Sequence, residues 1–190
     1  MDHFHWIAPV YDRLCPTPDP ERLLRLLEAP VDGRLLDVGG GTGRVAQGLH
    51  GVAGEVLVLD EAVGMLRQAH AKGLVAVRGH AERLPWPDGA FSRILLVDCL
   101  HHLRDQSRAA SELLRILAPG GRIVIEEPNV EQRSARLIAL GEKLLLMRSH
   151  FLSPQEVKRL FQAAGGEVRL EREGMNFWAV VLKAGSPWKP

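Results

Sequence analysis

Short apolar runs alternate with amphipathic segments along most of the chain, a pattern typical of strands and helices in regular alternation. Strand-like runs occupy residues 34–38, 55–60, 74–78, 91–97 and 122–126. Helical periodicity predicts helices between them, over residues 43–50, 62–72 and 105–117. The run over residues 91–97 is rich in Ile, Leu and Val, as expected when both faces of a strand are covered. This order predicts a parallel sheet with right-handed crossovers.

The end of the chain follows a different pattern. Ser153 and Glu156 form a capping box around Pro154, so a helix is predicted to begin there and to run to Gly165. Residues 167–172 and 177–183 then form strands joined by a short turn, which requires an antiparallel pair. The predicted fold class is therefore α/β, with a seven-stranded sheet that is mostly parallel, a C-terminal antiparallel hairpin, and helices on both faces.

Two segments stand outside this alternation. The length of 190 residues and the 46% hydrophobic content predict a single domain over residues 1–190. Residues 1–28, with a helix near Pro20–Glu28, are interpreted as an N-terminal cap, and residues 130–150 as an amphipathic helical lid. Their apolar side chains predict a hydrophobic pocket that would bind a substrate, although ordinary helix packing explains these side chains equally well. These side chains are Phe4, Trp6, Ile7, Leu140, Leu144, Met147 and Phe151.

Charge and cysteine content narrow the classes of function. A net charge of +1 and a pI near 7.9 give no argument for binding nucleic acid or an anionic membrane. Cys15 and Cys99 are far apart and are interpreted as free thiols. No signal-peptide pattern opens the chain, and the apolar run Ile94–Val97 is too short to span a bilayer, so a cytoplasmic protein is expected. The oligomeric state is not indicated.

The eight histidines raise the question of a metal site. Metal ligands need convergent spacing, whereas His101 and His102 are adjacent and point in different directions. No metal site is predicted. Of the two, His102 is expected to cap or pack, and His101 to face a cleft.

The glycine turn after the first strand is the most informative feature. Asp37 leads into Gly39, Gly41 and Gly43, a G-x-G-x-G pattern that lets a ligand approach the backbone. A dinucleotide-binding turn would place its third glycine at position 44, where this chain has Arg44. Asp60 ends the second strand, about 20 residues after such a turn, where a carboxylate accepts hydrogen bonds from a ribose diol. The alternative role for Asp60 is to cap the following helix.

Later blocks make the comparison specific. They are Leu84-Pro85-Trp86-Pro87-Asp88-Gly89-Ala90-Phe91, Val97-Asp98 followed by His101-His102, and Leu117-Ala118-Pro119-Gly120-Gly121. In this order, and with the glycine turn, the chain resembles the class I S-adenosylmethionine-dependent methyltransferases. The closest resemblance is to the small-molecule type that includes the menaquinone and ubiquinone biosynthesis methyltransferases. The resemblance covers roughly residues 34–127 and implies a Rossmann-like fold.

The resemblance implies roles for particular residues. Gly39 and Gly41 would line the methionine part of S-adenosylmethionine, and Asp37 would support the turn or the cofactor's amino group. The same turn includes Thr42 as a cofactor-binding residue. Asp60 would hold the ribose hydroxyls. The remaining cofactor contacts would come from Glu61 and Met65 near the ribose and adenine, His80 and Ala81 at the adenine edge, and Val97 near the sulfonium.

One position departs from the family pattern. Where His80 stands, the family usually has an aspartate that accepts from the adenine amino group. A neutral imidazole accepts such a bond only in one tautomer. Recognition of adenine would then depend more on the Ala81 backbone amide, and His80→Asp is expected to keep or tighten cofactor binding.

The resemblance implies transfer of a methyl group by in-line displacement, with S-adenosylhomocysteine as product, and the expected acceptor is small and partly apolar. Candidates for a general base are Asp98, His101, His150 and Tyr11, and the sequence singles out none of them. Two other functions stay open. One is a cofactor-binding domain without turnover that serves as a regulatory or partner subunit. The other is a nicotinamide-dependent oxidoreductase, against which Arg44 argues.

Overall fold

A single sheet forms the centre of the computed structural model, which describes residues 12, 17–131 and 149–184. Its strands lie in the order β3-β2-β1-β4-β5-β7-β6. Neighbouring strands among β1 to β5 are parallel, while β7 runs antiparallel to both β5 and β6. The predicted parallel sheet with a terminal hairpin is confirmed. The strands are β1 (Val31–Val38), β2 (Ala53–Asp60), β3 (Val75–Arg78), β4 (Phe91–Val97), β5 (Leu117–Pro128), β6 (Gly166–Glu173) and β7 (Asn176–Lys183).

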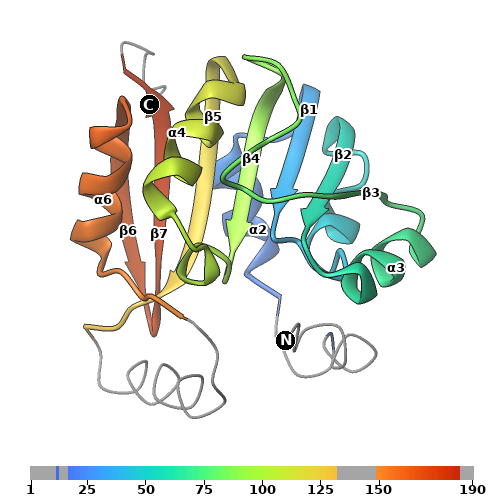
Figure 1. Cartoon of the computed structure of the whole chain (residues 1–190), viewed down its shortest axis with the longest axis horizontal. Coiled ribbons are helices and arrows are strands. Elements are labelled where there is room, and N and C mark those ends of the chain that lie inside the picture. Colours follow the sequence, from blue (N-terminus) through green and yellow to red (C-terminus); the bar gives the residue numbers. More distant parts are fainter. Residues whose placement is uncertain (1–11, 13–16, 132–148, 185–190) are drawn as a thin grey trace.

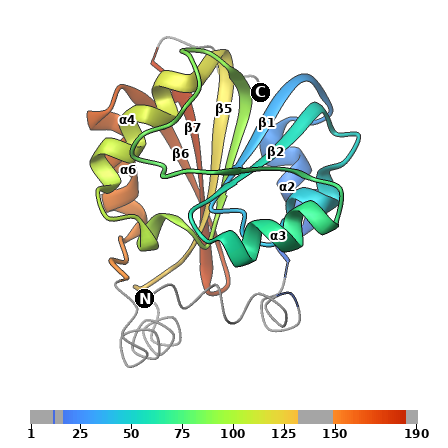
Figure 2. The same cartoon turned by 45° about the vertical axis from the view of Figure 1, so that its right-hand side comes forward.

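Helices cover both faces of the sheet. Figure 2 shows α4 (Gln106–Ile116) and α6 (Pro154–Ala163) on one side, and α2 (Pro20–Leu27) and α3 (Val63–Ala71) on the other. Side chains alternate between the faces along each strand. Leu36 accordingly packs in the cluster beneath α4 and α6, and Leu35 in the cluster beneath α2 and α3. The predicted capping box of Ser153 with Glu156 is present, and Asp105 caps α4 by accepting from the Arg108 amide.

The helix predicted over residues 43–50 is wrong. Residues 41–45 form turns, and only the short 3₁₀ helix η1 (Ala46–Leu49) follows. Gly41 and Gly43 have φ values of 55° and 72°, outside the right-handed helical region, so no α-helix begins at the glycine turn. The turn therefore presents its amides without a helix behind it.

The connection from β3 to β4, residues 79–90, contains no helix. Figure 1 shows it as a long irregular segment that crosses the front of the molecule from β3 to β4. Its first residues lie at the carboxyl end of the sheet, where ligands bind in open parallel sheets.

The predictions for the two outlying segments are covered only in part. The helix near Pro20–Glu28 is confirmed as α2. Outside the described residues lies most of the predicted N-terminal cap, namely the part of residues 1–28 that precedes α2. The same holds for the predicted lid over residues 130–150, apart from its two ends. In the part of the chain that the structure describes, no helix has the length and apolar character needed to cross a membrane.

Candidate cofactor-binding site

A cleft opens at the carboxyl ends of β1, β2, β3 and β4. The space within it, including its open mouth, is about 770 Å³. Apolar side chains form much of its wall, and a few polar groups converge on it. The lining residues are Val38, Gly39, Gly41, Leu59, Asp60, Glu61, Ala62, Met65, Gly79, His80, Ala81, Glu82, Asp98, Cys99, His102, Leu103 and Arg104.

The glycine turn forms one side of this cleft, with positive φ at Gly39 and Gly41. A Cβ on Gly39 would stand 2.1 Å from the Cys99 sulfur, so only glycine fits there. A Cβ on Gly41 would point toward Met65 Sδ at 3.8 Å and Asp60 Oδ2 at 3.9 Å, two groups that line the cleft. The glycine at position 41 therefore keeps space open beside the Asp60 carboxylate.

Asp60 joins the end of β2 to the glycine turn. Its Oδ2 accepts from the Gly41 amide at 3.0 Å, and its Oδ1 accepts from the Ala62 amide at 2.8 Å. Asp60 is not the N-cap of α3, as the alternative role would require, because that position is held by Ala62. Asp60 instead closes the turn just before the helix. Asp60 also lines the cleft, so its carboxylate, a group that accepts hydrogen bonds, stands at the wall where a ligand would bind.

Asp37 lies beneath the turn and does not line the cleft. Its side chain is 1% exposed, and a Cβ on Gly40 would come within 2.6 Å of its Cγ. The pKa of Asp37 is raised to about 7, chiefly by burial, while the Arg44 charge lowers it and the nearby Asp60 charge raises it. Of the two roles implied by the resemblance, this position fits support of the turn.

Thr42 and Arg44 do not line the cleft either. The buried Thr42 hydroxyl donates to Asp12, and Lys72 Nζ lies 2.5 Å from the other oxygen of the same carboxylate. Although partial burial raises the pKa of Asp12, the hydrogen bonds from Lys72 and Thr42 outweigh it and lower that pKa. Arg44, which occupies the place of a dinucleotide turn's third glycine, reaches to 3.9 Å from Asp98 at the end of β4.

The far end of the cleft brings together the residues predicted for the ribose and adenine. Glu61, Met65, His80 and Ala81 all line it. His80 Nδ1 lies 3.3 Å from Glu61 Oε2, and both side chains are more than half exposed. Because a carboxylate accepts hydrogen bonds, this contact favours the imidazole tautomer with its proton on Nδ1, which leaves Nε2 as the acceptor.

The opposite end of the cleft is formed by the loop after β4. Glu127, a residue of β5, binds this loop. Glu127 Oε1 accepts from the amides of Cys99 and Leu100 at 3.0 and 2.7 Å, and Glu127 Oε2 lies 2.6 Å from His101 Nδ1. His101 is buried and stacks on Phe151 with ring centroids 4.2 Å apart. His102 lines the cleft instead, so the expected roles of these two histidines are reversed.

Of the four candidates for a general base, Asp98 lines the cleft. His101 is buried behind the loop, and the exposed His150 donates its amide to the His101 carbonyl. Tyr11 lies outside the described residues. Val97, predicted near the sulfonium, is buried and does not line the cleft, although Asp98 and Cys99 directly after it do.

Sequence reasoning missed several lining residues, and two kinds of signal could have found them. Val38 and Leu59 stand beside the predicted Gly39 and Asp60, at the ends of their strands. Cys99, Leu103 and Arg104 belong to the loop after β4, which shares the same sheet edge. The lining role of Glu82 depends on how the connection after β3 folds, which no short pattern reveals.

Metal chemistry has no visible basis in the described ranges, residue 12 with residues 17–131 and 149–184. No group of three or more His, Cys, Asp or Glu side chains gathers there in a way that could hold a metal ion. Cys99 is a buried free cysteine, and burial raises its thiol pKa well above the ordinary value, as does the Glu127 charge. Cys15 lies outside the described residues.

Comparison with known proteins now decides the family. The profile of a methyltransferase domain family matches residues 11–171, which is most of the chain. The chain belongs to this methyltransferase domain family. With the sheet order described above, this confirms the resemblance to class I S-adenosylmethionine-dependent methyltransferases.

Curated relatives of this methyltransferase domain point to the same group. The demethylmenaquinone methyltransferase of Thermus thermophilus is 37% identical over 139 residues, which cover 65% of this chain and 63% of the relative. The ubiquinone/menaquinone biosynthesis C-methyltransferase UbiE of Vibrio cholerae is 35% identical over 105 residues, covering 50% of this chain and 40% of the relative. The match thus spans less than two thirds of each relative's length.

A solved structure supports the fold. An S-adenosylmethionine-dependent methyltransferase of Thermotoga maritima superposes with a TM-score of 0.75, covering 95% of this chain and 99% of that one. The identity is 22%, so this likeness establishes the architecture of the methyltransferase domain and nothing finer.

Proposed function

We propose that this protein transfers a methyl group from S-adenosylmethionine to a small, partly apolar acceptor, and that the cleft holds the cofactor. The arrangement of Asp60 and Gly41 carries the proposal, because it places a carboxylate at the cleft wall beside a backbone that has no side chain in the way. A hydrogen-bonding group next to an open backbone suits a ribose diol followed by a slim amino-acid chain.

The rest of the cleft fits the same ligand. Leu59, Ala62 and Met65 offer apolar surface to a flat base, and the His80–Glu61 pair stands at its edge. When bound, S-adenosylmethionine supplies an electrophilic methyl group on a sulfonium. Residues of the loop from Asp98 to Arg104 line the same cleft, and we infer that this loop orients the acceptor and excludes water. We assign no general base.

The choice of a small acceptor rests on the relatives and on the predicted hydrophobic pocket. Both curated relatives described above are named for menaquinone or ubiquinone biosynthesis, and quinone precursors are small molecules. Because the match covers only part of those proteins, a related aromatic acceptor is proposed as a class and no individual compound is named.

A turnover assay tests the proposal. The full chain is incubated with S-adenosylmethionine labelled in the methyl group and with panels of apolar phenols and quinols, of protein, and of nucleic acid. Transfer to members of the small-molecule panel is the expected result. Label only in protein or nucleic acid would contradict the small-acceptor proposal. Cofactor binding without transfer to any panel would favour the regulatory or partner subunit instead.

A further inference from the structure

The connection between β3 and β4 is held in place by side chains from elsewhere. Residues 79–90 have no helix or strand to order them, and ordering a backbone costs about 1–2 kcal/mol per residue. Backbone hydrogen bonds to other elements hold its two ends, from Gly79 to the Asp60 carbonyl and from Gly89 to the Arg115 carbonyl. The middle of the connection depends on other groups.

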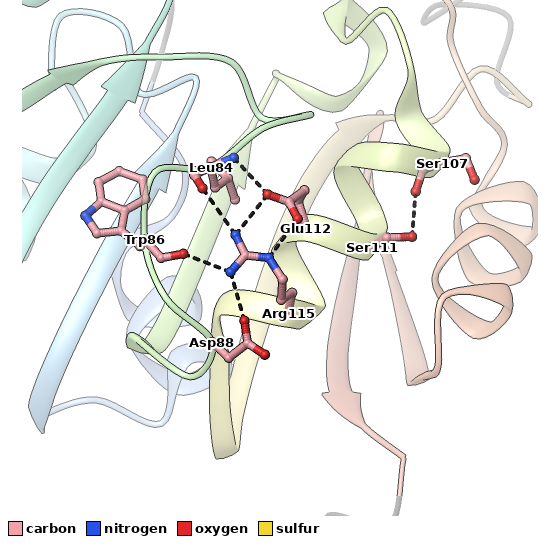
Figure 3. Close-up of polar contacts among 7 residues, drawn as sticks. All are labelled: Leu84, Trp86, Asp88, Ser107, Ser111, Glu112 and Arg115. Carbon is pink, nitrogen blue, oxygen red and sulfur yellow. Dashed lines mark hydrogen bonds and ion pairs between the residues drawn. The ribbon is translucent and has the colours of Figure 1, made fainter.

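Those groups are Arg115 and Glu112, on the face of α4 that looks toward the connection (Figure 3). The Arg115 guanidinium donates to the Trp86 carbonyl at 2.8 Å, to Asp88 Oδ1 at 3.0 Å and to the Leu84 carbonyl at 3.2 Å. Glu112 pairs with Arg115 Nε at 2.7 Å and accepts from the Leu84 amide at 2.9 Å. The planar guanidinium with its five donors suits such a set of acceptors, which lysine could not serve together.

The same connection forms the cleft wall a few residues earlier. His80, Ala81 and Glu82 line the cleft, and Leu84, the first residue that Arg115 and Glu112 hold, follows two positions after Glu82. Glu82 Oε1 also accepts from the amides of Arg104 and Asp105 at 3.0 and 3.3 Å. The lining segment is therefore attached at Glu82 to the loop before α4 and, two residues later, at Leu84 to α4 itself.

We propose that Arg115 and Glu112 are positioning residues for cofactor binding, which fix residues 80–82 against the nucleoside end of the cleft without touching the ligand. The inference rests on the proposed function, since it assumes that the cleft binds an adenosine cofactor. It goes beyond that function by assigning a binding role to residues outside the cleft. Misplacement of a binding group by a distant change weakens binding as well as stability.

Calorimetry on the full chain tests this, with S-adenosylhomocysteine and adenosine as separate ligands. Arg115→Met is expected to weaken both by about the same factor, on the order of tenfold, because residues 80–82 meet only the nucleoside. Glu112→Gln keeps the size of the side chain and is expected to weaken both ligands by about threefold, since the Arg115 contacts persist without the charge. This milder variant serves if Arg115→Met does not fold.

Arg25→Met is the matched control. Arg25 of α2 also makes a two-pronged contact, to Glu171 of β6 at 3.0 and 3.3 Å, and neither residue lines the cleft. Measured well below all melting temperatures, this variant is expected to bind both ligands as the wild type does. Wild-type affinity in Arg115→Met and Glu112→Gln would overturn the positioning role, and so would a loss for S-adenosylhomocysteine without a loss for adenosine. A wild-type chain that binds neither ligand would refute the proposed function itself, before any variant is compared.

Discussion

Asp60 Oδ2 accepts the backbone N–H of Gly41 at 3.0 Å, so the acid at the end of β2 and the glycine turn after β1 are one unit. β1 and β2 are neighbouring parallel strands, which brings their carboxyl ends to the same edge of the sheet. The residue proposed to bind ribose is thus also the residue that orients the turn. Substitutions at Asp60 should therefore affect both parts of the cofactor site.

Asp60→Asn should weaken S-adenosylhomocysteine binding by about 10- to 100-fold, because a hydrogen bond to a charged group contributes about 1.5–3 kcal/mol. The amide keeps one acceptor oxygen but loses the charge and half of the acceptor positions. Calorimetry measures the change. Asp32→Asn, an exposed position in β1 that does not line the cleft, removes the same charge and should leave affinity unaltered. Equal affinities for the Asp60 and Asp32 variants would contradict the ribose role.

Gly41→Ala tests whether open space beside Asp60 is needed. The added methyl would enter the cleft between Met65 and Asp60, so a loss of cofactor affinity is expected beyond any loss of stability. Positive φ at position 41 adds backbone strain of about 1–2 kcal/mol for a non-glycine residue. Gly73→Ala is the control, because Gly73 has φ +79° with nothing within 4 Å of its added Cβ. Both variants should lose similar stability, and only Gly41→Ala should lose affinity.

Asp37 should make the stability of the ligand-free protein depend on pH. Its folded pKa is raised to about 7 from an ordinary 3.8, so the stability that it contributes is complete below pH 3.8 and is lost as pH rises through 7. Asp37→Asn removes this loss and should raise the melting temperature at pH 8. The expected gain in the free energy of unfolding is on the order of a few kcal/mol at pH 8, and this gain should shrink as the pH is lowered toward 4. A melting temperature lowered equally at pH 5 and pH 8 would contradict this account.

His80→Asp remains predicted to keep or tighten cofactor binding, and the structure adds a condition. A carboxylate at position 80 would stand close to Glu61, which lies 3.3 Å from His80 Nδ1. The like charges would repel each other, so His80→Asp should bind S-adenosylhomocysteine more tightly when it is combined with Glu61→Gln. A large loss of affinity in both the single and the double variant, measured by calorimetry, would refute the prediction.

Much of the fold was predictable because the signals are local. The apolar runs that became β1, β2 and β4 are buried on both faces, and the capping box at Ser153 marks where α6 begins. The prediction of a helix over residues 43–50 was wrong because apolar periodicity carries no information about the positive φ at Gly43 or about its close packing. A Cβ on that glycine would meet Leu74 at 2.1 Å.

The site was predictable where a strand ends and much less so where loops meet. Gly41 and Asp60 follow directly from the strand pattern, and both line the cleft. The reversed positions of His101 and His102 depend on Glu127, which binds His101 from a strand 26 residues later in the chain. The contacts of Arg115 with the β3–β4 connection are likewise long-range, at separations of 27 to 31 residues. Sequence periodicity carries no information about such pairs.

Calorimetric titration of the wild-type chain with S-adenosylhomocysteine, beside a parallel titration with NAD, tests the central claim most directly. We expect saturable one-to-one binding of S-adenosylhomocysteine and no measurable heat with NAD, because Arg44 replaces the third glycine of a dinucleotide turn. Binding of NAD, or no binding of S-adenosylhomocysteine by the folded chain, would contradict the assignment of the cleft.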